Sequence, residues 1–72
     1  MKSMEVVMKS YSSREVIKLL EADGWHLADV EGSHHQFKHD FKKGRVTVPH
    51  PRKDLRLRTL KSIEKQSGLK FN

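Results

Sequence analysis

The apolar residues near the start of the chain repeat at the spacing of an amphipathic helix. Ser12 and Glu15 form a capping-box pattern, in which each side chain bonds a free backbone N–H of the first turn. The apolar stripe that follows consists of Val16, Ile17, Leu19 and Leu20. Asp23 and Gly24 end the pattern, because glycine readily adopts the left-handed conformation that follows a last helical turn. We therefore expect a helix from Ser12 to Asp23.

Three short segments with strand-like composition follow this helix. Their bounds are Trp25–Val30, His34–His39 and Arg45–Pro49. Gly32-Ser33 separates the first two segments, and residues 40–44 form the next turn. Because these connections are short, we expect consecutive strands to pair antiparallel.

Phe37 determines the orientation of the middle strand, because it is the only large apolar residue of that segment. Successive side chains of a strand point to opposite faces. We therefore expect His35 and His39 on the core side with Phe37. The side chains expected on the opposite face are His34, Gln36 and Lys38. In the third strand, Val46 and Val48 are expected to face the core.

A second helix is predicted around Thr59–Ser67, after a linker at Arg52–Arg58. Leu60 and Ile63 form its inner face, and Gly68 ends it. The order helix, three strands, helix predicts an α+β domain. In this domain two helices cover one face of a three-stranded antiparallel sheet, and the other face is open for a ligand.

Residues 1–10 precede this pattern. The tripeptide Met-Lys-Ser occurs at Met1 and again at Met8, so we expect an N-terminal extension with an alternative start at Met8, followed by one domain over residues 11–72. No apolar run reaches the roughly 18 residues that span a bilayer. The chain has no cysteine, which excludes a disulfide scaffold and cysteine-ligated zinc and favours a cytoplasmic location.

The basic residues are concentrated in the second half of the chain. The 72 residues carry a net charge of +6. Residues 1–36 hold 4 basic and 6 acidic side chains, whereas residues 37–72 hold 11 basic and 3 acidic ones. A positive region of this density is typical of nucleic-acid-binding proteins, although solubility alone also requires some net charge.

Five histidines are the candidates for chemistry, at positions 26, 34, 35, 39 and 50. His35 and His39 share a strand face but lie about 13 Å apart along the strand, which is too far to chelate one ion. The pattern therefore predicts neither a metal site nor another cofactor.

Gly32-Ser33-His34 is the sharpest local motif. A Gly-Ser entry to a strand leaves backbone N–H groups free for a phosphate, and an imidazole titrates near neutral pH. The cations expected around it are Lys38, Arg45, Lys53, Arg56 and Arg58. This set would suffice for metal-free RNA cleavage, in which the 2′-OH attacks the adjacent phosphate. The alternative is a solvent-facing strand histidine without a function. His50, between two prolines, either contacts phosphate or ends the strand.

Four ordered segments together resemble the HicA toxin family, also called YcfA-like, over about residues 11–69. They are SREVIKLLEADGW at 13–25, GSHHQFKH at 32–39, VTVPHP at 46–51 and TLKSIEKQSGL at 59–69. The resemblance implies a fold like that of double-stranded-RNA-binding domains. It also implies a ribosome-independent mRNA interferase, the toxin of a type II toxin–antitoxin pair, neutralised by a HicB antitoxin.

The resemblance also implies roles for particular residues. The family's essential histidine carries over to His34, three residues before Phe37, with His35 in reserve. Gly32 carries over as the turn residue, and His50 matches the family's Pro-His region. The residues expected to bind RNA are Gly32, Ser33, Lys38, Arg45, His50, Lys53, Arg56 and Arg58.

We therefore expect a cytoplasmic, metal-independent endoribonuclease that needs no cofactor. Its expected partners are mRNA and a HicB-type antitoxin, with no membrane and with DNA contact only through the antitoxin. Two alternatives from other classes are a non-catalytic RNA-binding module of the same fold and an interaction protein whose basic face docks an acidic partner.

Overall fold

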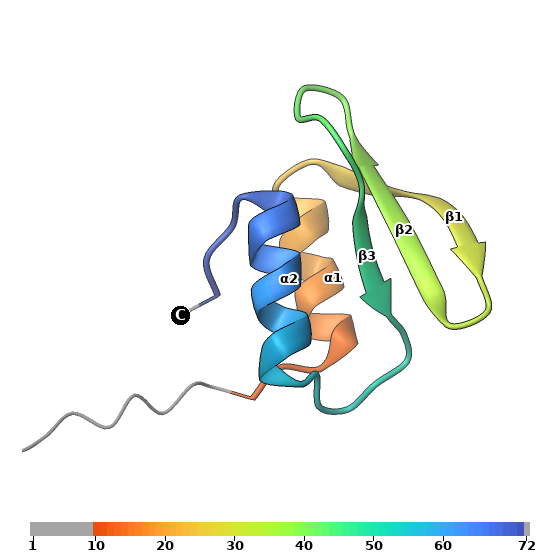
Figure 1. Cartoon of the computed structure of the whole chain (residues 1–72). Helices are drawn as coiled ribbons and strands as arrows, with labels where there is room; N and C mark the ends of the chain where they lie inside the picture. The colour runs from red at the N-terminus through yellow and green to blue at the C-terminus, as the bar shows by residue number, and fades with distance from the viewer. Residues whose placement is uncertain (1–9, 72) are drawn as a thin grey trace, which may run out of the picture.

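The computed structural model describes residues 10–71, which form the predicted order of elements (Figure 1). The elements are α1 (Ser13–Ala22), β1 (Trp25–Glu31), β2 (His34–His39), β3 (Val46–Pro49) and α2 (Leu57–Ser67). The α+β class and the α-β-β-β-α order are thus confirmed. Residues 1–9 of the predicted extension, including the alternative start at Met8, lie outside the described residues.

The capping box at the start of α1 is present as predicted. The Glu15 N–H donates to Ser12 Oγ at 3.1 Å, and the Ser12 N–H donates to Glu15 Oε1 at 2.9 Å. At the other end of the chain, α2 begins at Leu57 rather than at Thr59. Arg56 is its extended N-cap residue, so the connection from β3 to α2 is shorter than predicted.

The three strands form one antiparallel sheet with β2 in the centre. Residues that pair directly across strands share a face, and Phe37 pairs with Leu27 on one side and Val46 on the other. The predicted faces of β2 are confirmed, because Phe37 is buried and His34 and Lys38 are exposed. A bulge at Ala28 shifts the register within β1.

Both helices lie on the same side of the sheet, and their inner faces close the core (Figure 1). The fully or nearly buried apolar side chains are Tyr11, Val16, Leu20, Trp25, Phe37, Val46, Val48, Leu55, Leu60, Ile63 and Phe71. Within the part of the chain that the structure describes, neither helix is long and apolar enough to cross a membrane.

The apolar stripe of α1 differs from the prediction at Leu19, which is 42% exposed. The buried face of α1 consists of Ser13, Val16 and Leu20. At 3.6 residues per turn, Leu19 lies roughly 100° around the helix from the centre of that face. Ser13, only 1% exposed, occupies the inner face in its place.

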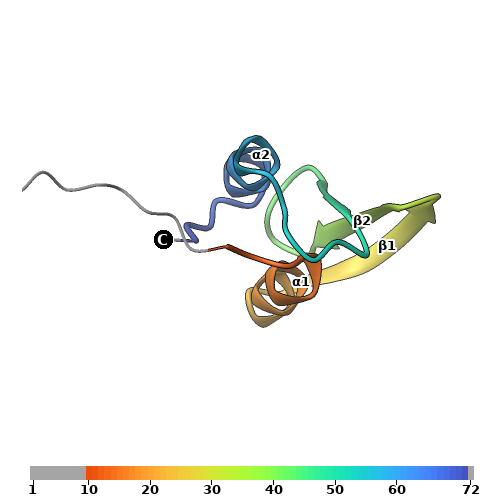
Figure 2. The ribbon, with the colours of Figure 1, turned by 90° about the horizontal axis from the view of Figure 1, so that it is seen from below.

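The hairpin of β1 and β2 extends beyond the helices, as the view from below shows (Figure 2). Leu27 and Val30 lie on the helix-facing side of β1, paired with Phe37 and His35, yet remain 50% and 46% exposed. The sheet therefore leaves part of its inner face open near the start of β2, in addition to its outer face.

Candidate functional site

The turn between β1 and β2 lies against the end of β3. His34 pairs with Pro49, and the His50 N–H donates to the Ser33 carbonyl at 2.8 Å. Gly32 has a φ of +59°, the left-handed conformation that this tight turn requires. The sheet thus brings Gly32-Ser33-His34 beside the Pro-His-Pro segment, although these motifs are far apart in the sequence.

His34 is exposed on the outer face of the sheet, at the start of β2. Its cross-strand neighbours are Glu31 on β1 and Pro49 on β3. Among the described residues, none hydrogen-bonds the His34 ring. A solvent molecule or a bound phosphate can therefore reach its imidazole directly.

His35 faces the opposite way and packs against His50. The two imidazole rings meet edge to face, with centroids 4.9 Å apart and an interplanar angle of 86°. The Nδ1 atom of His35 is buried and has no hydrogen-bond partner in the structure. His35 is thus half-buried on the inner face, as the alternation around Phe37 predicted.

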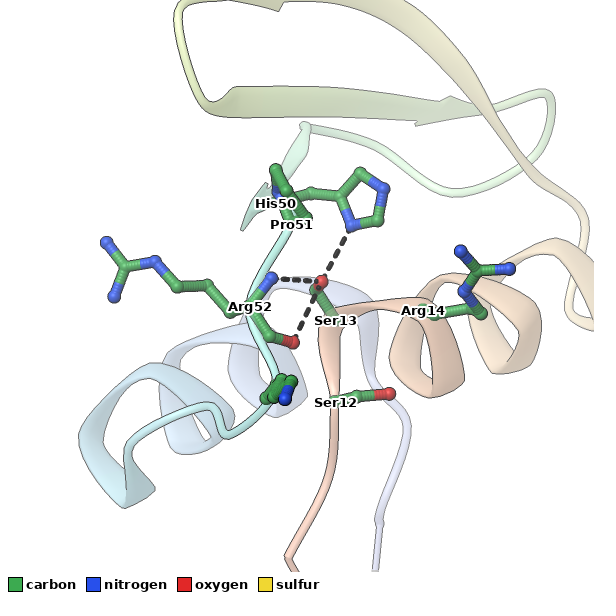
Figure 3. A pocket seen from close by; sticks show the side chains of 7 residues that line it. Ser12, Ser13, Arg14, His50, Pro51 and Arg52 are labelled. Atoms are coloured by element: carbon green, nitrogen blue, oxygen red, sulfur yellow. Dashed lines mark hydrogen bonds between the residues drawn. The ribbon is translucent and has the colours of Figure 1, made fainter.

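His50 is fixed by the first turn of α1. Its Nδ1 lies 2.6 Å from Ser13 Oγ, which also accepts the Arg52 N–H at 2.8 Å and lies 3.2 Å from the Arg52 carbonyl (Figure 3). The Ser13 N–H donates to the same carbonyl at 2.9 Å. The segment after β3 is therefore bonded to the start of α1 through backbone and side chain together.

The other two histidines lie away from this junction. His39 Nδ1 accepts the backbone N–H groups of Phe41 and Lys42 at 3.0 and 3.1 Å, so the proton of the neutral ring lies on Nε2. Nε2 then donates to the Asp23 carbonyl at 2.6 Å. His26 lies on the exposed surface, 3.4 Å from Asp40.

Lys42 lies beside the same end of α1. Its Nζ donates to Asp23 Oδ2 at 2.7 Å and to the Ser67 carbonyl at 3.1 Å. The hydrogen bond from Lys42 lowers the pKa of the Asp23 carboxyl below its ordinary value, with its positive charge and the Trp25 indole N–H adding to the effect.

The predicted cations do not all gather around His34. Lys38 and Arg45 lie along the outer face, where Arg45 donates to Gln36 Oε1 at 2.8 Å. Lys53 lies in the connection after β3, and Arg56 and Arg58 lie at the start of α2. The structure therefore separates them into an outer-face pair and a group on the β3–α2 side.

A pocket of about 420 Å³ lies between the start of α1 and the β3–α2 connection, lined by residues 12–14 and 50–53. Of these, only His50 and Lys53 were predicted from the sequence as site residues. Ser13, Arg14 and Arg52 were missed. Ser13 carried a usable signal, because it is a polar residue at a position of the helical repeat that faces the core.

The sequence from α1 to the residues after α2 matches a known family. A family model described as "HicA toxin of bacterial toxin-antitoxin" matches residues 13–69, which include all five elements of the fold. The chain belongs to the HicA toxin family. A search of curated proteins gives no match to this chain.

Membership in the HicA family identifies the chain as the toxin of a toxin–antitoxin system and implies a HicB-type antitoxin as its partner. Among residues 10–71, no group of three or more His, Asp or Glu side chains is placed to hold a metal ion.

Proposed function

We propose that this HicA protein is a cytoplasmic endoribonuclease that cleaves mRNA without a metal ion, with His34 as the general acid or base. The observation that carries the proposal is the position of His34. It is exposed on the open face of the sheet, at the junction of the Gly-Ser turn with the Pro-His-Pro segment. The HicA family match supports a toxin whose action is consistent with RNA cleavage.

The reaction requires only proton transfer and charge stabilisation. His34 removes the proton of a ribose 2′-OH while O2′ bonds to the adjacent phosphorus. The bond from phosphorus to O5′ then breaks, and O5′ takes up a proton, leaving a 2′,3′-cyclic phosphate and a 5′-hydroxyl. Positive side chains stabilise the extra negative charge on the phosphate oxygens in the transition state. The residues proposed to contact RNA are Gly32, Ser33, Lys38, Arg45, His50, Lys53, Arg56 and Arg58.

His34 is preferred to His35 because of access. The His35 ring is half-buried against His50, and its Nδ1 has no contact with solvent. His34 has neither restriction. His35 remains the reserve candidate, since it is adjacent in the sequence and its ring lies near the same end of β2.

The test compares His34→Ala, His35→Ala and His26→Ala in purified protein and in induced bacteria. His26 is the matched control, because it is an exposed histidine on the same sheet and outside the proposed site. Proton transfer by a positioned residue contributes about 10²–10⁴-fold to rate, so His34→Ala should lose cleavage by that factor and His26→Ala should retain it. Cleavage by His34→Ala at the parent rate would refute the assignment.

The second candidate function is a non-catalytic RNA-binding module. The observation that favours it is the free His34 ring, because a catalytic histidine is commonly oriented by a hydrogen bond and none of the described residues supplies one. Incubation of purified RNA with the protein in EDTA separates the two functions. A nuclease shortens the RNA, whereas a binding module only retards it in a native gel.

We also propose that the HicB-type antitoxin neutralises the toxin by covering His34 and the outer-face cations. This predicts that Lys38→Glu weakens antitoxin binding, as measured by titration calorimetry. Lys18→Glu on α1 is the control, because its charge lies on the other side of the sheet.

A further inference from the structure

The pocket between α1 and the β3–α2 connection contains an imidazole held in one orientation. Figure 3 shows the His50 ring with one nitrogen bonded to Ser13 and the other on the far edge of the ring. The Ser13 hydroxyl can donate to the Arg52 carbonyl at 3.2 Å while it accepts from both Arg52 N–H and His50 Nδ1. The 2.6 Å contact also allows the Ser13 hydroxyl to donate to His50 Nδ1, and in that tautomer the proton of the neutral ring lies on Nε2, which can donate to an anion.

The charged side chains around this pocket are mainly positive. Arg14, Arg52 and Lys53 all line it. Arg14 extends on the same side as the free edge of His50, whereas Arg52 points away from Arg14 (Figure 3). The two nearby carboxylates have hydrogen-bond donors of their own, since Glu15 accepts the Ser12 N–H and Asp54 accepts the Ser10 hydroxyl.

Among the described residues, none pairs with the Arg14 guanidinium, which is exposed at the rim of the pocket. Most N–H groups at the start of α1 are already hydrogen-bonded, so they add little to the attraction of the pocket for an anion. The first-turn N–H groups of Ser13, Glu15 and Val16 are bonded to Arg52, Ser12 Oγ and the Ser12 carbonyl. An anion in the pocket would therefore be held by side chains, with Arg14 and His50 as the two donors on one side.

We propose that this pocket binds a phosphate group of single-stranded RNA, with Arg14 and His50 as its contact residues and Ser13 as the positioning residue for His50. The pocket would be a second contact point for the RNA substrate of the proposed function. The identity of its ligand rests on that function. The backbone bond between His50 and Ser33 places the pocket next to the turn that carries His34. A strand of RNA can thus contact both places at once.

The experiment measures the binding of labelled 2′-O-methyl RNA of about 12 nucleotides, by fluorescence anisotropy at several salt concentrations. This RNA has no free 2′-OH, so it stays intact whichever residue is catalytic. Arg14→Gln is compared with Lys18→Gln, which removes the same charge from α1 one turn further on and outside the pocket. Both side chains are exposed, so neither change disturbs the core.

A plot of the logarithm of the binding constant against the logarithm of the salt concentration has a negative slope. For a single strand, loss of one phosphate contact makes this slope less steep by about 0.7. We expect Arg14→Gln to show this decrease and to weaken binding about tenfold, since a charge-assisted hydrogen bond is lost. Lys18→Gln should change neither value. Equal effects of the two variants, or no effect of Arg14→Gln, would overturn the site.

Nuclear magnetic resonance of the imidazole nitrogens gives a second readout. Addition of the same RNA should shift the Nε2 resonance of His50, and the shift should shrink in Ser13→Ala, where the ring loses the hydroxyl that positions it. An unchanged His50 resonance in the wild type would contradict the proposal. If the wild type binds 2′-O-methyl RNA through Arg14 but does not cut natural RNA, the phosphate subsite stands and the nuclease function fails.

Discussion

His39 fastens the end of α1 to the turn that follows β2, and its replacement should destabilise the whole domain. The ring accepts two backbone N–H groups at Nδ1 and donates Nε2–H to the Asp23 carbonyl. It also packs edge-on against Trp25, with centroids 5.1 Å apart. His39→Ala removes all of these interactions in one substitution.

The unfolding free energy lost in His39→Ala follows from the burial of each hydrogen bond that the ring makes. The bond to the Asp23 carbonyl is half-buried, and an unsatisfied group in such a place costs about 1–3 kcal/mol. The two N–H groups of the turn are exposed, so water replaces His39 there at little cost. With the lost ring contact, the total is about 2–3 kcal/mol of unfolding free energy. For a domain of this size, that lowers Tm by about 10 °C or more.

The assay is thermal unfolding followed by circular dichroism, with His26→Ala as the matched control. His26 is also a histidine of the sheet, but its ion pair with Asp40 is exposed and should contribute less than about 1 kcal/mol. His39→Ala should keep RNA cleavage at low temperature, because the residue has no part in the proposed site. A Tm within about 2 °C of the wild type, well short of the shift expected for a loss of this size, would refute the reasoning.

Two further predictions concern the same end of α1. Gly24 and Gly44 both have positive φ, at +102° and +82°, but a Cβ on Gly24 would lie 2.8 Å from His39 Nε2 whereas one on Gly44 would meet open space. Gly24→Ala should therefore lower the denaturant midpoint more than Gly44→Ala. When the same two substitutions are made in His39→Ala protein, they should lower the midpoint by similar amounts. Lys42→Met should raise the pKa of Asp23, measured by carboxyl titration in nuclear magnetic resonance. Because folding lowers this pKa, its contribution to stability is present above the ordinary carboxyl pKa of about 4 and is lost as the pH falls through the folded value. The stability gap between wild type and Lys42→Met should thus narrow in acid, and a gap independent of pH would contradict the assignment.

Local patterns were sufficient to predict the elements of this HicA protein. Ser12 and Glu15 predict where α1 begins because a capping box involves only residues of one turn. Phe37 predicts the faces of β2 because alternation is a property of the strand itself. The start of α2 was predicted less well, since Arg56 forms no side-chain cap that the sequence could reveal.

The candidate site was predicted only in part, because its second half depends on contacts between distant segments. The motif at Gly32-Ser33-His34 is contiguous and visible in the sequence. The hydrogen bond between Ser13 and His50 joins residues 37 positions apart, and the local sequence of neither segment predicts this contact. The same holds for Arg14, which becomes part of a pocket only when the β3–α2 connection packs beside α1.

The sequence by itself determined the order of helices and strands, the basic second half and the resemblance to HicA toxins, because these follow from short-range periodicity, composition and contiguous motifs. The tertiary structure decided what surrounds each histidine and which contacts its ring makes. It half-buried His39 as an acceptor for the turn, left His34 exposed on the outer face, and packed His35 against a His50 that is hydrogen-bonded to Ser13. An imidazole can accept, donate, pack or titrate, and only its neighbours in space select among these roles.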